Sequence, residues 1–185
     1  MRKDFGTKAW MYPLPVLIVG TYDEEGNANA MNAAWGGIYD SSHVILCLSA
    51  GHKTTKNINK RGAFTVSFAD AGHVTAADYV GLASANDTPD KMEKAGFVTE
   101  KSRHVDAPII CELPVTLECT LTKVNEDGNI IGKIVNVSAD VKVLGEDGMI
   151  DAEKLAPIAF DPVRSAYHVL GEKVGNAFSD GNALK

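Results

Sequence analysis

The feature that most constrains this fold is the segment Pro114–Lys123, in which apolar and polar side chains alternate. One face would carry Val115, Leu117, Cys119 and Leu121, and the other Thr116, Glu118, Thr120 and Thr122. A period of two is typical of a half-buried antiparallel strand. A partner strand is predicted over Ile131–Leu144, where one face carries Ile131, Val135, Val137, Ala139, Val141 and Val143. A strand of this length suggests a barrel, in which strands bend to serve both ends.

Turns that combine acidic residues with glycine separate the apolar runs, at Asp23–Asn27, Glu126–Asn129 and Glu146–Gly148. Glycine allows a positive φ and Asp or Asn bonds its own backbone, so each turn predicts a hairpin. Further strands are predicted at Leu14–Tyr22, His43–Ser49 and Ala63–Phe68, and helices at Thr54–Lys60, His73–Ala83 and Pro89–Ala95. The segment Val163–Val174 fits either a strand or a helix. The prediction is a mainly β barrel with peripheral α-helices, forming one domain over residues 1–185.

Composition and charge argue against several classes of protein. The 185 residues carry a formal net charge of −6, which disfavours nucleic-acid binding because that needs clustered cations. The longest apolar runs, such as Val16–Gly20 and Val44–Leu48, are too short to span a membrane, and no signal peptide is expected. Cys47, Cys111 and Cys119 form no CxxC pair and lie in apolar stretches, which predicts buried free thiols and a cytoplasmic protein.

The first segment that could carry chemistry contains Asn29, Ala30, Met31, Asn32, Ala33, Ala34 and Trp35. Its small residues would let a flat ligand approach the backbone N–H groups, and its two asparagines offer amide donors and acceptors. These properties suit a flavin ring. The same run would equally suit a tightly packed strand with Trp35 as a core aromatic, and the residues alone favour that packing interpretation.

The second segment, Ser49–Ile58, follows a predicted strand and contains a predicted helix start near Thr54. Helix N-termini present free N–H groups and the positive end of a dipole, so they attract anions. Lys53 adds a positive charge, and Ser49, Thr54 and Thr55 add hydroxyl donors. Two interpretations stay open at this point: the segment binds a phosphate, or Thr54 or Thr55 simply caps the helix.

Several other chemistries have no support in the sequence. The five histidines show no metal-ligand spacing with cysteine or carboxylate residues, so a metal site is not expected. There is no Walker loop and no GxGxxG fingerprint, and the GxSxG elbow of serine hydrolases is also missing.

The order and spacing of these segments resemble the flavin reductase-like, FMN-binding split-barrel family, with the flavoredoxin branch the most similar. The resemblance covers about residues 10 to 178. It rests on Pro15–Thr21, Gly26-Asn27, Asn29–Trp35, Ser49–Ile58, Phe64–Ser67, Asp78–Gly81, Ser84, Asp90–Met92, Pro108–Ile110, Leu117–Cys119, Gly132 and Tyr167–Gly171.

The resemblance implies a six-stranded antiparallel split barrel that dimerises and holds one FMN per subunit. Residues Asn29–Trp35 would hold the isoalloxazine ring, and Ser49, His52, Lys53, Thr54, Thr55 and Asn57 the phosphate and ribityl chain. With the resemblance, flavin binding replaces simple packing as the favoured interpretation of both segments. Electrons would come from a reduced nicotinamide dinucleotide or a redox partner protein, and NAD(P)H as a transient co-substrate stays open. A flavin-binding electron carrier or sensor without turnover is the alternative.

A homodimer is expected from the residues as well. Ile130–Ile131 and Ile134–Val135 are adjacent apolar pairs, so in a strand one member of each pair must face outward. An outward apolar stripe is best buried by a twofold partner.

Overall fold

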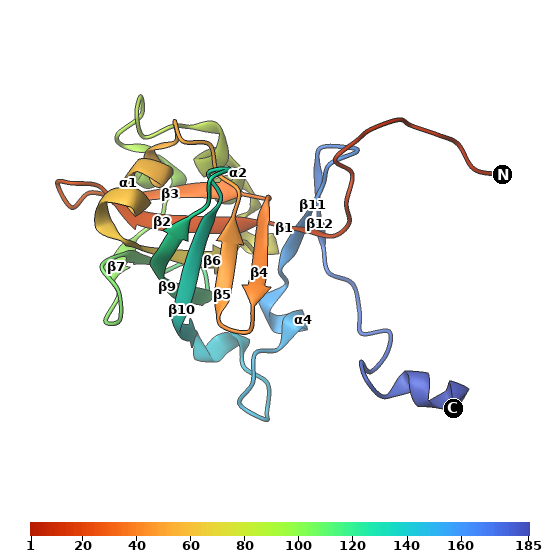
Figure 1. The fold of residues 1–185 in the computed structure, drawn as a ribbon. Helices are drawn as coiled ribbons and strands as arrows, with labels where there is room; N and C mark the ends of the chain where they lie inside the picture. The colour runs from red at the N-terminus through yellow and green to blue at the C-terminus, as the bar shows by residue number, and fades with distance from the viewer.

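The computed structural model describes residues 1–185 and is dominated by one curled antiparallel sheet (Figure 1). Its seven strands run in the order β3-β2-β6-β9-β10-β5-β4, and every neighbouring pair is antiparallel. These strands are β2 (Leu17–Tyr22), β3 (Ala28–Ala33), β4 (Gly36–Asp40), β5 (His43–Leu46), β6 (Ala63–Phe68), β9 (Val115–Val124) and β10 (Ile130–Ala139). The sheet has one strand more than the expected six. The strand that was not predicted is β4, which pairs with β5 at the sheet edge. It begins with Gly36-Gly37, and glycine is unusual within a strand, so the sequence shows no strand pattern there.

Smaller elements surround this sheet. Two further sheets contain β1 (Leu14–Pro15), β11 (Ile158–Asp161) and β12 (Ala166–Val169), and β7 (Thr99–Lys101) with β8 (Pro108–Ile110). The α-helices are α1 (Lys53–Arg61), α2 (Val74–Leu82), α3 (Lys91–Ala95) and α4 (Ala152–Leu155). Short 3-10 helices are η1 (Ala71–His73), η2 (Val141–Val143) and η3 (Asp180–Leu184). No helix combines the length and the apolar character needed to cross a membrane.

The core lies on both faces of the sheet. On one face, Leu17 and Val19 of β2 join a buried cluster with Phe64, whereas Val16 and Ile18 join a second cluster beneath α2. This double burial explains the continuous apolar run at the start of β2, since neither face of the strand meets water.

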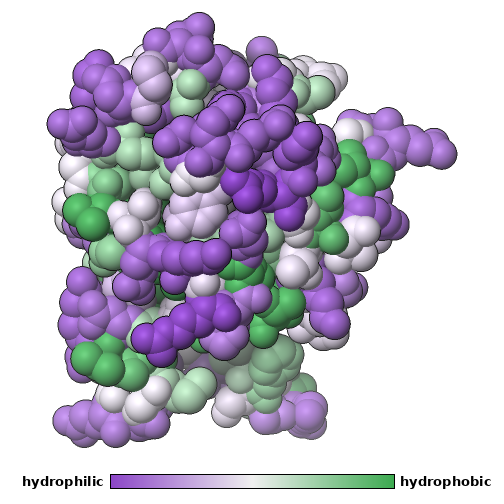
Figure 2. Space-filling model, turned by 90° about the vertical axis from the view of Figure 1, so that its left-hand side faces the viewer, coloured by the Kyte–Doolittle hydropathy of each residue, from purple (hydrophilic) through white to green (hydrophobic).

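The side of the molecule that carries α1 and the β2–β3 turn has a largely hydrophilic surface (Figure 2).

The prediction that Pro114–Lys123 forms a half-buried strand is wrong for the polar face at the start of β9. Its polar residues Thr116 and Glu118 are only 2% and 1% exposed, because β7, β8 and the loop between them cover that face. Strand β10 ends at Ala139, and Val141–Val143 form the helix η2 where a continued strand was expected. Its register against β9 shifts between Ile134 and Asn136, which breaks the simple alternation.

Two burial predictions are also wrong. Only Cys119 is buried, whereas Cys47 and Cys111 are free and exposed. Both Ile130 and Ile131 are buried, so that pair contributes nothing to an outward stripe. The ambiguous segment Val163–Val174 contains a strand, β12.

Candidate cofactor site

One cavity gathers many of the residues expected to bind a cofactor. Its volume is about 320 Å³, and it lies between β3, the start of α1 and the segment joining α2 to α3. It is lined by Asn29, Met31, Asn32, His52, Lys53, Thr54, Val80, Gly81, Leu82, Ala83, Ser84, Ala85 and Lys91. Strand β3, helix α1 and the residue before the helix, His52, thus place six of the predicted residues around one cavity.

Asn29 supplies the most specific polar atom of this cavity. Its side chain is 3% exposed, and its Nδ2 donates a hydrogen bond of 2.8 Å to Thr54 Oγ1. Its Oδ1 is the only buried side-chain nitrogen or oxygen atom of the chain without a hydrogen-bond partner. A buried acceptor without a partner costs free energy, so this oxygen suits a ligand that donates a hydrogen bond.

The start of α1 offers uncapped backbone donors to the same cavity. The helix begins after His52, and no side chain caps its first N–H groups. Thr54 Oγ1 accepts from Asn29, and Thr55 Oγ1 donates to the carbonyl of Ser49 at 2.8 Å, so neither threonine is the cap. The interpretation of this segment as simple capping is therefore wrong, and free N–H groups are available to an anion.

The turn Asp23–Asn27 fastens both ends of α1. At the helix start, Lys53 Nζ lies 3.5 Å from Asp23 Oδ2. At the helix end, Arg61 Nε donates to the carbonyl of Asp23 at 2.9 Å. Burial alone would raise the pKa of Asp23, but hydrogen bonds from Asn27 and the charge of Lys53 outweigh burial and hold this pKa below its usual value. Lys53 is therefore already paired with a carboxylate.

Lys91 brings a second positive charge to the cavity. It is 2% exposed, and its Nζ donates to the carbonyls of Val80 at 3.2 Å and Ala83 at 2.8 Å. No carboxylate pairs with it, and burial lowers the pKa of Lys91 to about 8. An anion in the cavity would supply the missing counter-charge.

The remaining predicted residues lie elsewhere. Ala30 and Ala33 are buried in the two core clusters, and Asn57 Nδ2 donates to Thr21 Oγ1 at 3.0 Å. Ala34 and Trp35 line a different, mostly apolar hollow of about 580 Å³ beside residues 8–11. Trp35 is 58% exposed, so it is not a core tryptophan.

The segment from Val80 to Ala85, together with Lys91, was not among the predicted site residues. The sequence signal for it was the motifs Asp78–Gly81, Ser84 and Asp90–Met92, which form part of the family resemblance. In the structure, a Cβ added at Gly81 would lie 3.0 Å from Asn32 Cβ. That glycine lets α2 pack closely on β3. The same side of α2 is tied to the C-terminal sheet, because Tyr167 Oη donates to Asp78 Oδ1 at 2.7 Å.

Comparisons with known proteins agree with this geometry. The family described as "Flavin reductase like domain" matches residues 9–158. The structure of flavoredoxin from Desulfovibrio vulgaris (Miyazaki F) is 37% identical, covers 98% of this chain and 100% of that chain, and superposes with a TM-score of 0.95. Flavoredoxin from Methanosarcina acetivorans is 24% identical over 100% of both chains, with a TM-score of 0.90. Nitrilotriacetate monooxygenase component B from Bacillus cereus is 24% identical, covers 90% of this chain and 88% of that chain, and has a TM-score of 0.75.

Proposed function

Because the chain belongs to the flavin reductase-like family, with a split-barrel fold, we propose that it is an oxidoreductase that binds FMN non-covalently in the cavity around Asn29. It would take electrons from a reduced nicotinamide or from a partner protein and pass them to a flavin, a metal or a protein acceptor. The observation that carries the proposal is the unpartnered, buried Oδ1 of Asn29 in a cavity that also holds free helix N–H groups and Lys91.

The residues present fit FMN by the chemistry of their donors and acceptors. Asn29 Oδ1 would accept a hydrogen bond from the cofactor, while the N–H groups at the start of α1, with Lys53 and Lys91, would hold the terminal phosphate. When bound, FMN supplies the redox chemistry, and the protein supplies position and electrostatics. No side chain of the cavity has to act as a nucleophile in this proposal.

Two measurements test the proposal. Cofactor released by heat from the purified protein is expected to co-elute with FMN on chromatography; FAD, or no flavin, would contradict it. Rapid mixing of the flavin-loaded protein with NADH or NADPH under anaerobic conditions then separates the possible electron donors. Fast loss of the yellow colour supports a reductase. Loss only with an added partner reductase supports an electron carrier, and persistent colour with every donor supports a sensor.

We also propose that the protein is a cytoplasmic homodimer. Five large apolar side chains are at least 43% exposed on or near the edge strand β4 and on β10, namely Trp35, Ile38, Tyr39, Val135 and Val137. Apolar residues gathered in this way favour burial against a second copy of the chain. Light scattering at micromolar concentration should give twice the 19.7 kDa of one chain, and a monomer mass would refute the dimer.

A further inference from the structure

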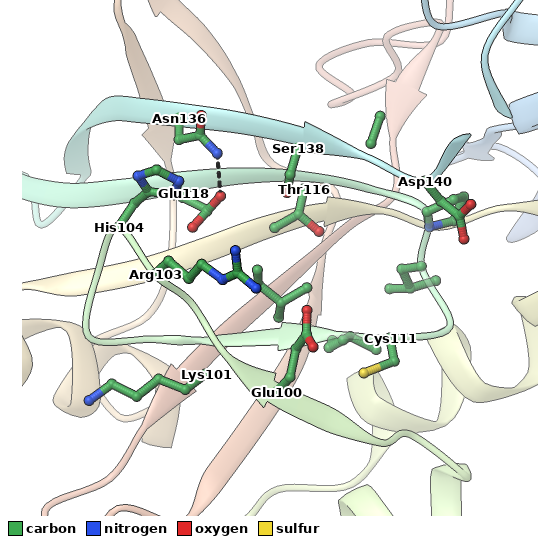
Figure 3. Close-up of a pocket in the computed structure, with 15 residues that line it drawn as sticks. Glu100, Lys101, Arg103, His104, Cys111, Thr116, Glu118, Asn136, Ser138 and Asp140 are labelled. Atoms are coloured by element: carbon green, nitrogen blue, oxygen red, sulfur yellow. Dashed lines mark hydrogen bonds between the residues drawn. The ribbon is translucent and has the colours of Figure 1, made fainter. Parts of the chain in front are cut away.

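A second cavity, of about 380 Å³, lies on another part of the barrel and shares no lining residue with the cofactor cavity. Its floor is the outer face of β9 and β10, where Thr116 and Glu118 stand beside Ser138 and Asn136 in register. Its opposite wall is formed by β7, β8 and the loop between them (Figure 3). A cavity of this size can enclose a small organic molecule.

The floor carries a buried carboxylate without a counter-charge. Glu118 is 1% exposed, and its two oxygens accept hydrogen bonds from neutral donors only, Ser102 Oγ and, at 2.6 Å, Asn136 Nδ2. No cationic side chain of the protein lies within ion-pair distance of it. A carboxylate can accept about four hydrogen bonds, so acceptor capacity is left for a ligand. A buried charge of this kind favours a cationic partner.

The wall carries a cation that is also unpaired. In Figure 3, Arg103 extends from the β7–β8 loop over the space between Glu118 and Glu100, yet it forms no ion pair. Two other charged residues that line the cavity are already paired, since Lys101 lies 3.6 Å from Asp106 and Asp140 lies 3.4 Å from Lys142. Glu100 on the wall forms no ion pair. The cavity thus offers one free guanidinium, Arg103, and two free carboxylates, of which Glu118 is the one on its floor.

Part of the remaining lining is apolar. Five of its side chains carry no polar atom, namely Ile109, Ile110, Leu113, Pro114 and Ala139. A ligand complementary to all three features has an ammonium group, a carboxylate and a short hydrocarbon side chain. We propose that this cavity binds a free amino acid with an apolar side chain, with its ammonium group against Glu118 and its carboxylate against Arg103.

The proposal does not depend on flavin binding, and its test uses the purified protein with whatever cofactor it carries. L-leucine, 3-methylbutylamine and 4-methylpentanoate share one hydrocarbon skeleton but carry both charges, only the cation or only the anion. Titration of isotope-labelled protein, followed by backbone amide NMR, is expected to shift signals of residues 100–118 and 136–140 with L-leucine. The two singly charged analogues should bind at least ten-fold more weakly, since each leaves one charged group of the cavity unsatisfied.

Two variants assign the contacts. Arg103→Gln changes an exposed residue, so it should leave folding intact, weaken L-leucine about ten-fold or more and leave 3-methylbutylamine unaffected. Glu118→Gln should weaken binding of both L-leucine and 3-methylbutylamine, and the dispersion of its backbone amide NMR signals reports whether this variant has folded. Arg164→Gln, an exposed arginine outside the cavity, is the matched control and should change neither affinity.

Several outcomes would overturn the proposal. One is the absence of signal shifts with L-leucine at millimolar concentration. A second is equal affinity for L-leucine and 3-methylbutylamine, which would show that the ligand is a simple cation. A third is unchanged L-leucine affinity in Arg103→Gln, which would place the carboxylate elsewhere.

Discussion

Replacement of Lys91 by methionine tests the electrostatics of the cofactor cavity most directly. The fall of its pKa from 10.5 to about 8 corresponds to about 3 kcal/mol against the charged amine in the folded protein. Methionine removes this penalty but leaves the carbonyls of Val80 and Ala83 without their donor, at a cost of about 1–3 kcal/mol each. The two effects oppose each other, so we expect the flavin-free variant to fold with nearly unchanged stability. We expect its affinity for FMN to fall about 10- to 100-fold at pH 7.

The pH dependence gives the sharper result. Below pH 8 the amine is charged in both the folded and the unfolded chain, so the folded protein bears the full free-energy cost of burying the charge. Between pH 8 and 10.5 the folded protein loses the proton first, so stability rises with pH in this window. FMN affinity should behave in the opposite way. It should be constant up to about pH 8 and then weaken by up to about ten-fold per pH unit, because binding must restore the proton.

Fluorescence titration of the flavin-free protein with FMN at pH 7, 8, 9 and 10 measures this dependence. Ionisation of free flavin at high pH is common to all variants, so the comparison with Lys91→Met removes it. Lys53→Met is the matched control: its amine is paired with Asp23, and the loss of pH dependence should be confined to the Lys91 variant. The same slope above pH 8 in the wild type and in Lys91→Met would refute the reasoning.

Three further predictions concern other parts of the chain. Cys47 and Cys111 are exposed, whereas burial and the neighbouring Glu118 raise the pKa of Cys119 to about 12. An aromatic disulfide reagent should therefore titrate two thiols in the native protein and the third only after unfolding. Gly132→Ala would bring a Cβ to 2.2 Å from Phe64 Cζ, so denaturant unfolding should show a loss of about 1–3 kcal/mol. Because Trp35 is 58% exposed, Trp35→Ala should change the stability of the monomer by less than about 0.5 kcal/mol, whereas sedimentation should show a weaker dimer.

The sequence predicts most of the strands and helices because their patterns are local. The hairpin turns at Gly26 and Gly128 both have the positive φ that glycine was expected to supply. Strand β6 and the helix at Lys53–Arg61 lie where the residues indicate them. Local pattern fails where the environment is set by distant residues. The polar face of β9 looks solvent-exposed until β7 and β8 cover it, and this covering depends on chain segments that carry little periodicity.

The residues that line the cofactor cavity also fall into two groups, those that local sequence patterns can identify and those that they cannot. Asn29, Lys53 and Thr54 could be found from short segments dense in polar donors, and the structure brings them to one space. Lys91 could not be found in this way, because a single lysine in a short helix reads as a surface residue. Its burial comes from the packing of α3 against the end of α2, where the carbonyls of Val80 and Ala83 accept its hydrogen bonds. Trp35 is a residue that the sequence assigned to the flavin site and that the structure places elsewhere. It follows Asn32 closely in the chain, but it lines a different hollow.

The fastening of α1 by the turn Asp23–Asn27 has a kinetic consequence. Lys53 holds one end of the helix and Arg61 the other, and both contacts are made by atoms of the chain itself without any cofactor atom. The helix start therefore needs no ordering when FMN binds, and little conformational entropy is lost at that step. Association should then proceed at the rate of an encounter with a rigid surface. Differences in affinity among variants of the cavity would arise almost entirely from how quickly the cofactor leaves.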